Sequence, residues 1–115
     1  MPDMSQPRPI DPAAIHGKVD VPYWNEALTA FNDHEVRMSV MTHPFEWHLH
    51  PDSDETFFTL EGEIVISFAA GEVILAAGQM LTVPRGTLHK TRPNGSRSVN
   101  LIFERANAET IFASP

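Results

Sequence analysis

The sequence has 115 residues, of which 42% are hydrophobic, so it suits one globular domain and is too short for two ordinary ones. It contains no cysteine, which excludes a disulfide framework and any zinc site built on thiolates. The net charge of −7 disfavours binding to nucleic acid or to an anionic membrane surface, because both need clustered Lys and Arg.

Targeting signals are absent from the printed sequence. Its apolar runs are all far shorter than the roughly 20 residues of a membrane-spanning helix. The N-terminus lacks the basic end and apolar stretch of a signal peptide. We therefore expect a cytoplasmic protein with neither membrane nor nucleic acid among its partners.

Residues 1–18 contain four prolines and predict an N-terminal arm, followed by a single domain over residues 19–115. Proline removes backbone donors and disfavours helix, so we expect this arm to be flexible or extended. A disordered tail and a strand laid across a partner subunit both fit this composition.

The stretch VPYWNEALTAFNDHEV, residues 21–36, predicts the one helix of the chain. Pro22 suits a first helical position, and Tyr23, Leu28 and Phe31 fall at helix-like spacing. The pair Asn32–Asp33 predicts the end of this helix.

After Glu35 the chain breaks into short segments rich in β-branched and aromatic residues, separated by turn-like sequences such as EGE and PNG. Many short strands at nearly even spacing predict an all-β sandwich or antiparallel barrel. We expect Trp47 and Leu49 to pack outward against a second subunit. The predicted core comprises Phe58, Leu60, Ile64, Ile66, Phe68, Leu101 and Phe103.

The segment HLHPDSDE, residues 48–55, predicts a hairpin that holds three metal ligands. Residues two apart on a strand point to the same face, so the side chains of His48 and His50 project together. The Pro51–Asp54 segment favours a chain reversal, and Glu55 then opens the returning strand beside the two imidazoles.

A fourth ligand follows in the segment GQMLTVPRGTLH, in which Pro84 and Gly86 predict a tight corner before His89. Three imidazoles and one carboxylate suit a divalent transition metal such as Fe, Mn, Ni, Zn, Co or Cu, and suit Ca or Mg poorly. A lone histidine is more often a solvated side chain, which is how we interpret His16, His34 and His43.

At these residues the sequence resembles the cupins, and in particular small single-domain members labelled mannose-6-phosphate isomerase-like. His48, His50, Glu55 and Gly62 reproduce the first cupin motif from its first histidine onward. Gly78, Pro84, Gly86 and His89 reproduce most of the second. Thr42 and Pro93 stand where the motifs expect glycine and asparagine, and neither position is a usual metal ligand.

The resemblance implies a small antiparallel β-barrel or jelly roll with a metal inside, held by His48, His50, Glu55 and His89. Small cupins commonly form homodimers, and we expect one here. The metal identity and the reaction do not follow from the resemblance, since its label reflects sequence similarity alone.

No catalytic residue stands out from the sequence. Glu46 shares strand parity with His48 and His50, so it either assists at the metal as an acid or base or simply reaches solvent. Phe57 and Thr59 share parity with Glu55 and are expected to line the pocket. Arg85 and Lys90 either steer an anionic substrate or are exposed turn charges.

We therefore expect a metal-dependent enzyme of the dioxygenase or isomerase class that acts on a small molecule. The alternative is a non-catalytic module in which the metal anchors a small ligand, which the shortage of acid and base groups favours. A third hypothesis is a barrel that holds no metal in the cell, although the intact ligand set argues against it.

Overall fold

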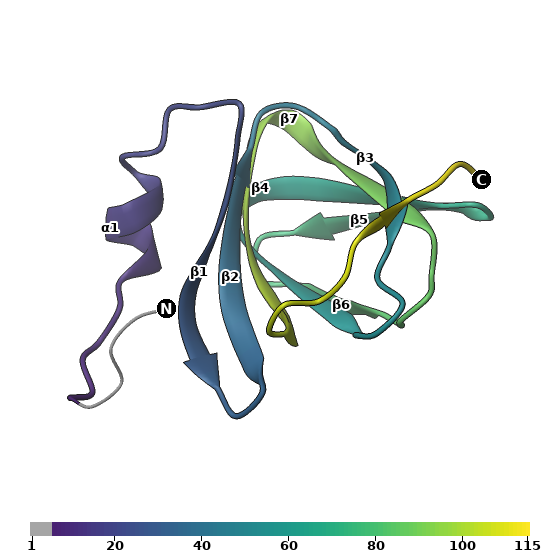
Figure 1. The fold of residues 1–115 in the computed structure, drawn as a ribbon. Helices are drawn as coiled ribbons and strands as arrows, with labels where there is room; N and C mark the ends of the chain where they lie inside the picture. The colour runs from purple at the N-terminus through teal and green to yellow at the C-terminus, as the bar shows by residue number, and fades with distance from the viewer. Residues whose placement is uncertain (1–5) are drawn as a thin grey trace.

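The computed structural model describes residues 6–115 and shows an antiparallel β-barrel preceded by one short helix (Figure 1). The all-β prediction is therefore confirmed. The elements in chain order are α1 (Pro12–His16), β1 (Tyr23–Phe31), β2 (His34–Met41), β3 (Phe45–Leu49), β4 (Glu55–Phe68), β5 (Gly71–Ala76), β6 (Met80–Val83), β7 (His89–Arg105) and β8 (Ile111–Phe112).

The two long strands β4 and β7 organise the barrel. Strand β7 pairs with β2, β3 and β4, while β4 also pairs with β5 and β6. The remaining neighbours are β1 beside β2 and β8 beside β3. Because β7 is shared between three strands, the sheet curls into a barrel, and Figure 1 shows β2, β3 and β6 on different sides of it.

The EGE and PNG segments, predicted as turns, lie inside continuous strands β4 and β7. The register between these strands shifts on either side of Gly62, so β4 carries bulges there that bend it around the barrel. Gly62 has a φ of 68°, and a Cβ at this position would clash with the carbonyl oxygen of Arg97. The glycine of the first motif is therefore required by the bend.

The helix predicted over the segment that starts at Pro22 is wrong. Tyr23–Phe31 is strand β1, which pairs with β2 from Tyr23↔Met41 to Phe31↔His34. Trp24 and Leu28 are four positions apart, a spacing that shares one face in a strand as well as in a helix, and both reach one apolar cluster. Asn32, predicted to end a helix, adopts a φ of 52° in the turn to β2.

A short helix does lie near the N-terminus, inside the segment predicted as an arm. Helix α1 begins after Asp11, whose carboxylate accepts hydrogen bonds from the backbone of Ala13 and Ala14. Ile15 and Val19 pack against the barrel, so this part of the arm is docked rather than extended. Residues 1–5 of the predicted arm lie outside the described residues.

The core forms two apolar clusters. One contains Met41, Phe57, Ile64, Ile66, Leu75, Val83 and Ile102, and the other contains Leu28, Met38, Val40 and Val99. Of the predicted core, Ile64 and Ile66 are fully buried. Phe68, Leu60 and Leu101 are half-buried against the clusters. Phe58 and Phe103 are also only half-buried.

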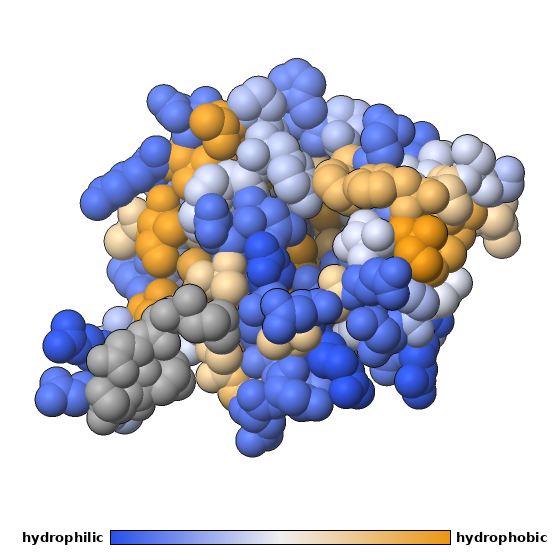
Figure 2. All heavy atoms as spheres, viewed as in Figure 1, coloured by the Kyte–Doolittle hydropathy of each residue, from blue (hydrophilic) through white to orange (hydrophobic). Residues whose placement is uncertain are grey.

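Hydrophilic side chains cover much of the face seen in Figure 2, with apolar residues in separate patches.

Leu49, expected to face a partner, lies opposite Ile111 of the same chain in the pairing of β3 with β8. The Lys90 ammonium group lies over Trp47, 5.2 Å from the centre of its ring. Among residues 6–115, no helix is long and apolar enough to cross a membrane.

Candidate metal centre

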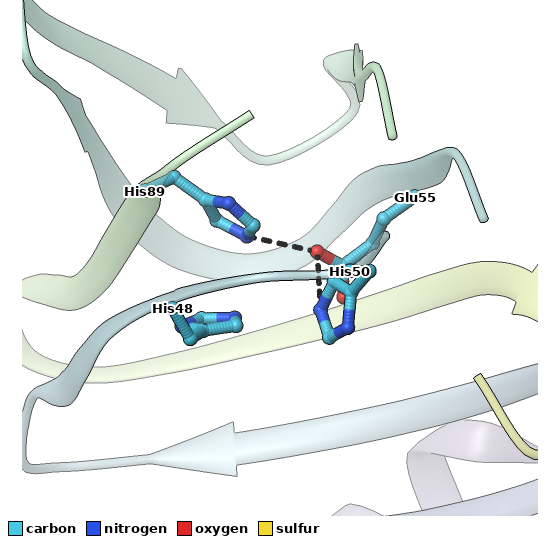
Figure 3. Close-up of side chains that lie close together, drawn as sticks. All are labelled: His48, His50, Glu55 and His89. Atoms are coloured by element: carbon cyan, nitrogen blue, oxygen red, sulfur yellow. Dashed lines mark hydrogen bonds and ion pairs between the residues drawn. The ribbon is translucent and has the colours of Figure 1, made fainter. Parts of the chain in front are cut away.

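Four side chains converge inside the barrel, as predicted from the sequence (Figure 3). His48 comes from β3 and His50 from the residue after it, while Glu55 opens β4 and His89 opens β7. One potential ligand atom from each residue lies within 4.8 Å of the other three. All four side chains are buried.

Two loops position these residues. The amide of Gly86 donates to the carbonyl of His50 at 2.8 Å, and the amide of Arg85 donates to the carboxylate of Asp54 at 2.9 Å. The corner before His89 is therefore fastened to the turn that joins His50 to Glu55. Strand pairing adds a direct link, because His48 lies opposite His89 across β3 and β7.

Each imidazole is oriented by a backbone carbonyl. The Nδ1 atoms of His48, His50 and His89 lie 2.7, 3.0 and 2.8 Å from the carbonyl oxygens of Glu46, Glu109 and Thr87. A carbonyl can only accept, so each Nδ1 carries the proton and donates. Nε2 is then the atom of each ring that is left to bind a metal, which is the arrangement of histidines that ligate one.

The Nε2 atoms fit a cation between them and Glu55. His89 Nε2 lies 3.0 Å from Glu55 Oε1, and His50 Nε2 lies 3.5 Å from the same oxygen. His50 Nε2 is buried and has no hydrogen-bond partner within residues 6–115. A lone pair facing a carboxylate at such distances is repulsive unless a proton or a metal ion lies between them. The donor set of three nitrogens and one carboxylate fits a divalent transition metal.

The pKa values of these groups reflect the same contacts in the metal-free protein. Burial lowers the pKa of His48 to about 4, which keeps this imidazole neutral. Burial also lowers the pKa of His50, but the adjacent Glu55 carboxylate outweighs burial and raises it to about 9. Burial raises the pKa of Glu55, yet His50 and His89 outweigh it and lower that pKa to about 2.

A cavity of about 440 Å³ opens at this cluster and is lined by His48, His50 and Glu55. Phe57 lines it as predicted, whereas Thr59 is turned away and donates its hydroxyl to Asn100. Residues of β1 and β2 form the wall that the sequence analysis missed: Tyr23, Asn25, Glu35, Arg37, Ser39 and Met41. A further wall comes from Asn107, Ala108 and Thr110 near the C-terminus.

Glu104 is the main titratable group that sequence reasoning missed. It lines the cavity with only 9% of its surface exposed, and its Oε2 atom has no hydrogen-bond partner in the described part of the chain. Burial, followed by the charge of Glu55, raises the pKa of Glu104 to about 7. Strand alternation could have identified this residue from the sequence, because Glu104 lies on the same face of β7 as the buried Asn100 and Ile102.

The other predicted site residues lie elsewhere. The side chain of Glu46 is exposed and does not line the cavity, so this residue contributes its backbone carbonyl alone. Arg85 is exposed and Lys90 covers Trp47, and neither lines the cavity. His43 is exposed, as expected of a solvated histidine, whereas His34 and His16 are half-buried.

Comparison with known proteins matches this chain to one family model and to a relative in another organism. A model described as "Cupin domain" matches residues 34–103, which is more than half of the chain. The chain is 44% identical over 100 residues to "Uncharacterized protein YdbB" of Bacillus subtilis, covering 86% of this chain and 88% of that protein.

Solved structures show the same fold. A cupin-2 domain protein of Shewanella frigidimarina aligns with a TM-score of 0.78 at 26% identity, covering 84% of this chain and 93% of that one. The DMSP lyase DddQ of Ruegeria pomeroyi aligns with a TM-score of 0.71 at 20% identity, covering 82% and 53%. With the family match, the close relative and the barrel in agreement, the chain belongs to the cupin family.

Proposed function

We propose that this cupin binds one divalent transition metal through His48, His50, Glu55 and His89, and that it is a metal-dependent enzyme acting on a small molecule. The reaction class that we propose is dioxygenase or isomerase chemistry. The observation that carries the metal site is the shared orientation of the three imidazoles, whose Nδ1 atoms are all fixed by backbone carbonyls.

The cavity supports a small-molecule ligand. Its volume of about 440 Å³ is at the lower end of the range for ligand pockets, and three of the four proposed ligands, His48, His50 and Glu55, line it. An ion held by these four residues would still be able to bind an oxygen of a ligand in this space. A metal bound there would supply Lewis acidity and a template for the reacting groups.

An observation within the cavity favours an enzyme over a binding module. The sequence offered Glu46 as an acid or base, and that side chain is on the surface. Glu104 lines the cavity instead, and its raised pKa suits a group that exchanges a proton near neutral pH. DddQ, named as a lyase, gives an example of an enzyme on this fold, which supports the proposal by analogy alone.

The test begins with protein purified without added metal or a metal-affinity tag. Elemental analysis is expected to find close to one transition metal per chain in the parent and much less in a His89→Gln variant. Less than a tenth of an equivalent in folded parent, even after incubation with metal, would contradict the site.

The metal-loaded parent is then screened with diols, thiols, hydroxy ketones and sugars, following oxygen uptake for dioxygenase chemistry and proton NMR for isomerisation. Turnover that disappears in His89→Gln is the expected result. Saturable ligand binding without turnover under both assays would instead identify the non-catalytic module.

A further inference from the structure

Three buried carboxylates form a row across three neighbouring strands, each near the end of its strand. Glu35 on β2 lies opposite Glu104 on β7, and Glu104 lies opposite Glu55 on β4. The three residues are 7%, 9% and 5% exposed, and all of them line the cavity. Directly opposed residues of antiparallel strands have Cβ atoms about 5 Å apart, so like charges there repel one another.

The two ends of the row have charged partners. Glu35 Oε1 accepts a hydrogen bond from Arg37 Nη1 at 2.8 Å. Glu55 faces His89 and His50, or the metal ion that we propose between them. Each end therefore has a positive neighbour that offsets both its charge and its burial.

Glu104, in the middle, forms no ion pair with any described residue, although the charges of Arg37 and His50 act on it from a distance. Its Oε2 atom makes no hydrogen bond to any described residue, although it is buried and faces the cavity. Leaving a buried carboxyl oxygen unpaired is unfavourable, so a group that enters the cavity with a hydrogen-bond donor gains an acceptor already in place.

Arg37 does not turn the cavity into an anion site. Its Nε donates to the side-chain oxygen of Asn25 at 2.6 Å, and its Nη2 donates to the Asn25 carbonyl at 3.1 Å. With Nη1 on Glu35, each nitrogen of the guanidinium group already has a partner. The three carboxylates give this wall of the cavity a negative charge, which disfavours a further negative charge beside them.

We propose that the unpaired oxygen of Glu104 accepts a hydrogen bond from a hydroxyl group of the ligand, and that the ligand is a small uncharged hydroxy compound rather than a phosphate or carboxylate. This proposal rests on the proposed metal site, because the ligand would bind with one oxygen toward the metal and a hydroxyl toward Glu104. The close approach of β4 and β7 allows one small molecule to reach both.

The experiment uses Co²⁺-loaded protein, because the visible absorption of Co²⁺ reports ligands that enter its coordination sphere. Parent, Glu104→Gln and Glu61→Gln are compared at equal metal content. Glu61 is the matched control, since it is an exposed glutamate on β4 paired with Arg97. The probes are 1,3-dihydroxyacetone, 1,3-dimethoxyacetone, which lacks the hydroxyl donors, and azide as a small anion.

The parent and Glu61→Gln are expected to bind dihydroxyacetone about tenfold more tightly than dimethoxyacetone, which is the size of one hydrogen bond to a charged group. Glu104→Gln is expected to reduce this preference to less than about threefold and to bind azide about tenfold more tightly than the parent, because a neighbouring negative charge is gone.

Equal affinity of the parent for the two ketones, or no binding of dihydroxyacetone, would overturn the proposal without any variant. If Glu104→Gln leaves the azide affinity unchanged, the claim that the charge of Glu104 disfavours anionic ligands is wrong. A folded parent that takes up no Co²⁺ would contradict the metal site itself, so the two failures are distinguishable.

Discussion

Glu55 and Glu104 lie directly opposite each other on β4 and β7, yet their pKa values move in opposite directions. Burial tends to raise both. At Glu55 the imidazoles of His50 and His89 outweigh burial and bring the pKa to about 2. At Glu104 the charge of Glu55 adds to the effect of burial, and the pKa rises to about 7. Glu55 is therefore held as an anion that can bind a cation. Glu104, its neighbour, exchanges a proton near neutral pH.

Replacing Glu104 with Gln is expected to stabilise the metal-free protein at pH 8. Glu104 binds its proton more tightly in the folded protein than in the unfolded chain, where a glutamate titrates near 4.5. The folded state therefore holds more protons between about pH 4.5 and 7, and its stability falls as pH rises through this window. Arg37, His50, Glu35 and Glu55 face this group in both proteins and remain unchanged.

The measurement is urea unfolding of parent and Glu104→Gln at pH 5 and pH 8. We expect the variant to gain about 1 to 3 kcal/mol at pH 8 relative to the parent, and little at pH 5, from the size of the pKa shift. A gain that is the same at both pH values would show that the carboxylate charge is not its cause.

Metal binding at pH 7.5 is expected to release about one proton. His50 is protonated in the metal-free protein at this pH because Glu55 raises its pKa to about 9, and a ligating imidazole must be neutral. The apparent affinity should therefore rise about tenfold per pH unit up to the pKa of His50. Calorimetric titrations in two buffers of different ionisation enthalpy count the protons, and equal heats in both buffers would contradict this assignment.

The segment after β7 is expected to orient His50. The carboxylate of Asp52 accepts hydrogen bonds from the amide of Glu109 at 3.0 and 3.3 Å, and the carbonyl of Glu109 accepts from His50 Nδ1. Losing a direct hydrogen-bond partner of a metal ligand weakens metal affinity about 10- to 100-fold. Asp52 contacts His50 only through Glu109, one hydrogen bond further from the metal ligand. We therefore expect Asp52→Ala to weaken metal binding by about tenfold.

Two variants serve as controls for that measurement. Asp52→Asn keeps an acceptor oxygen and should bind metal like the parent. Asp11→Ala removes another aspartate that accepts backbone amides, at the start of α1 and away from the site. If Asp52→Ala binds metal as tightly as Asp11→Ala, Asp52 has no part in orienting His50.

We also predict a homodimer. In the described part of the chain β1 is an edge strand that pairs with β2 alone, and Phe31 at its end is 48% exposed. Such edges are usually covered, and a second copy would do so. Light scattering at micromolar concentration should give twice the mass of 12.8 kDa, and a value near 12.8 kDa would refute the dimer.

The grouping of the four proposed metal ligands was predictable from sequence, three of them from local rules and His89 from the segment that resembles the second cupin motif. Alternation places His48 and His50 on one face, a turn returns Glu55, and a glycine–proline corner precedes His89. The far wall of the cavity was not predictable in the same way. Glu35 and Glu104 are 69 positions apart in the numbering and meet only through the register of β2 with β7, which no local pattern contains.

The misassigned helix has a related cause. The apolar residues of Tyr23–Phe31 fit a helical period because both faces of this strand carry them, Tyr23 packing on one core cluster and Trp24 and Leu28 on the other. Pairing with β2 then decides the conformation, since the strand buries Leu28 in the core and turns Tyr23 and Asn25 toward the cavity. Local propensity carries no information about that pairing.

The central claim is that Glu55 completes a metal site with three histidines, and calorimetric titration of three metal-free proteins tests it most directly. The parent is expected to bind one divalent transition metal per chain, and Glu61→Gln should match it, because Glu61 is exposed and paired with Arg97. Glu55→Gln should bind at least about 10- to 100-fold more weakly, as expected when a ligand rather than an outer partner is lost. Equal affinity of Glu55→Gln and the parent would contradict the four-residue site.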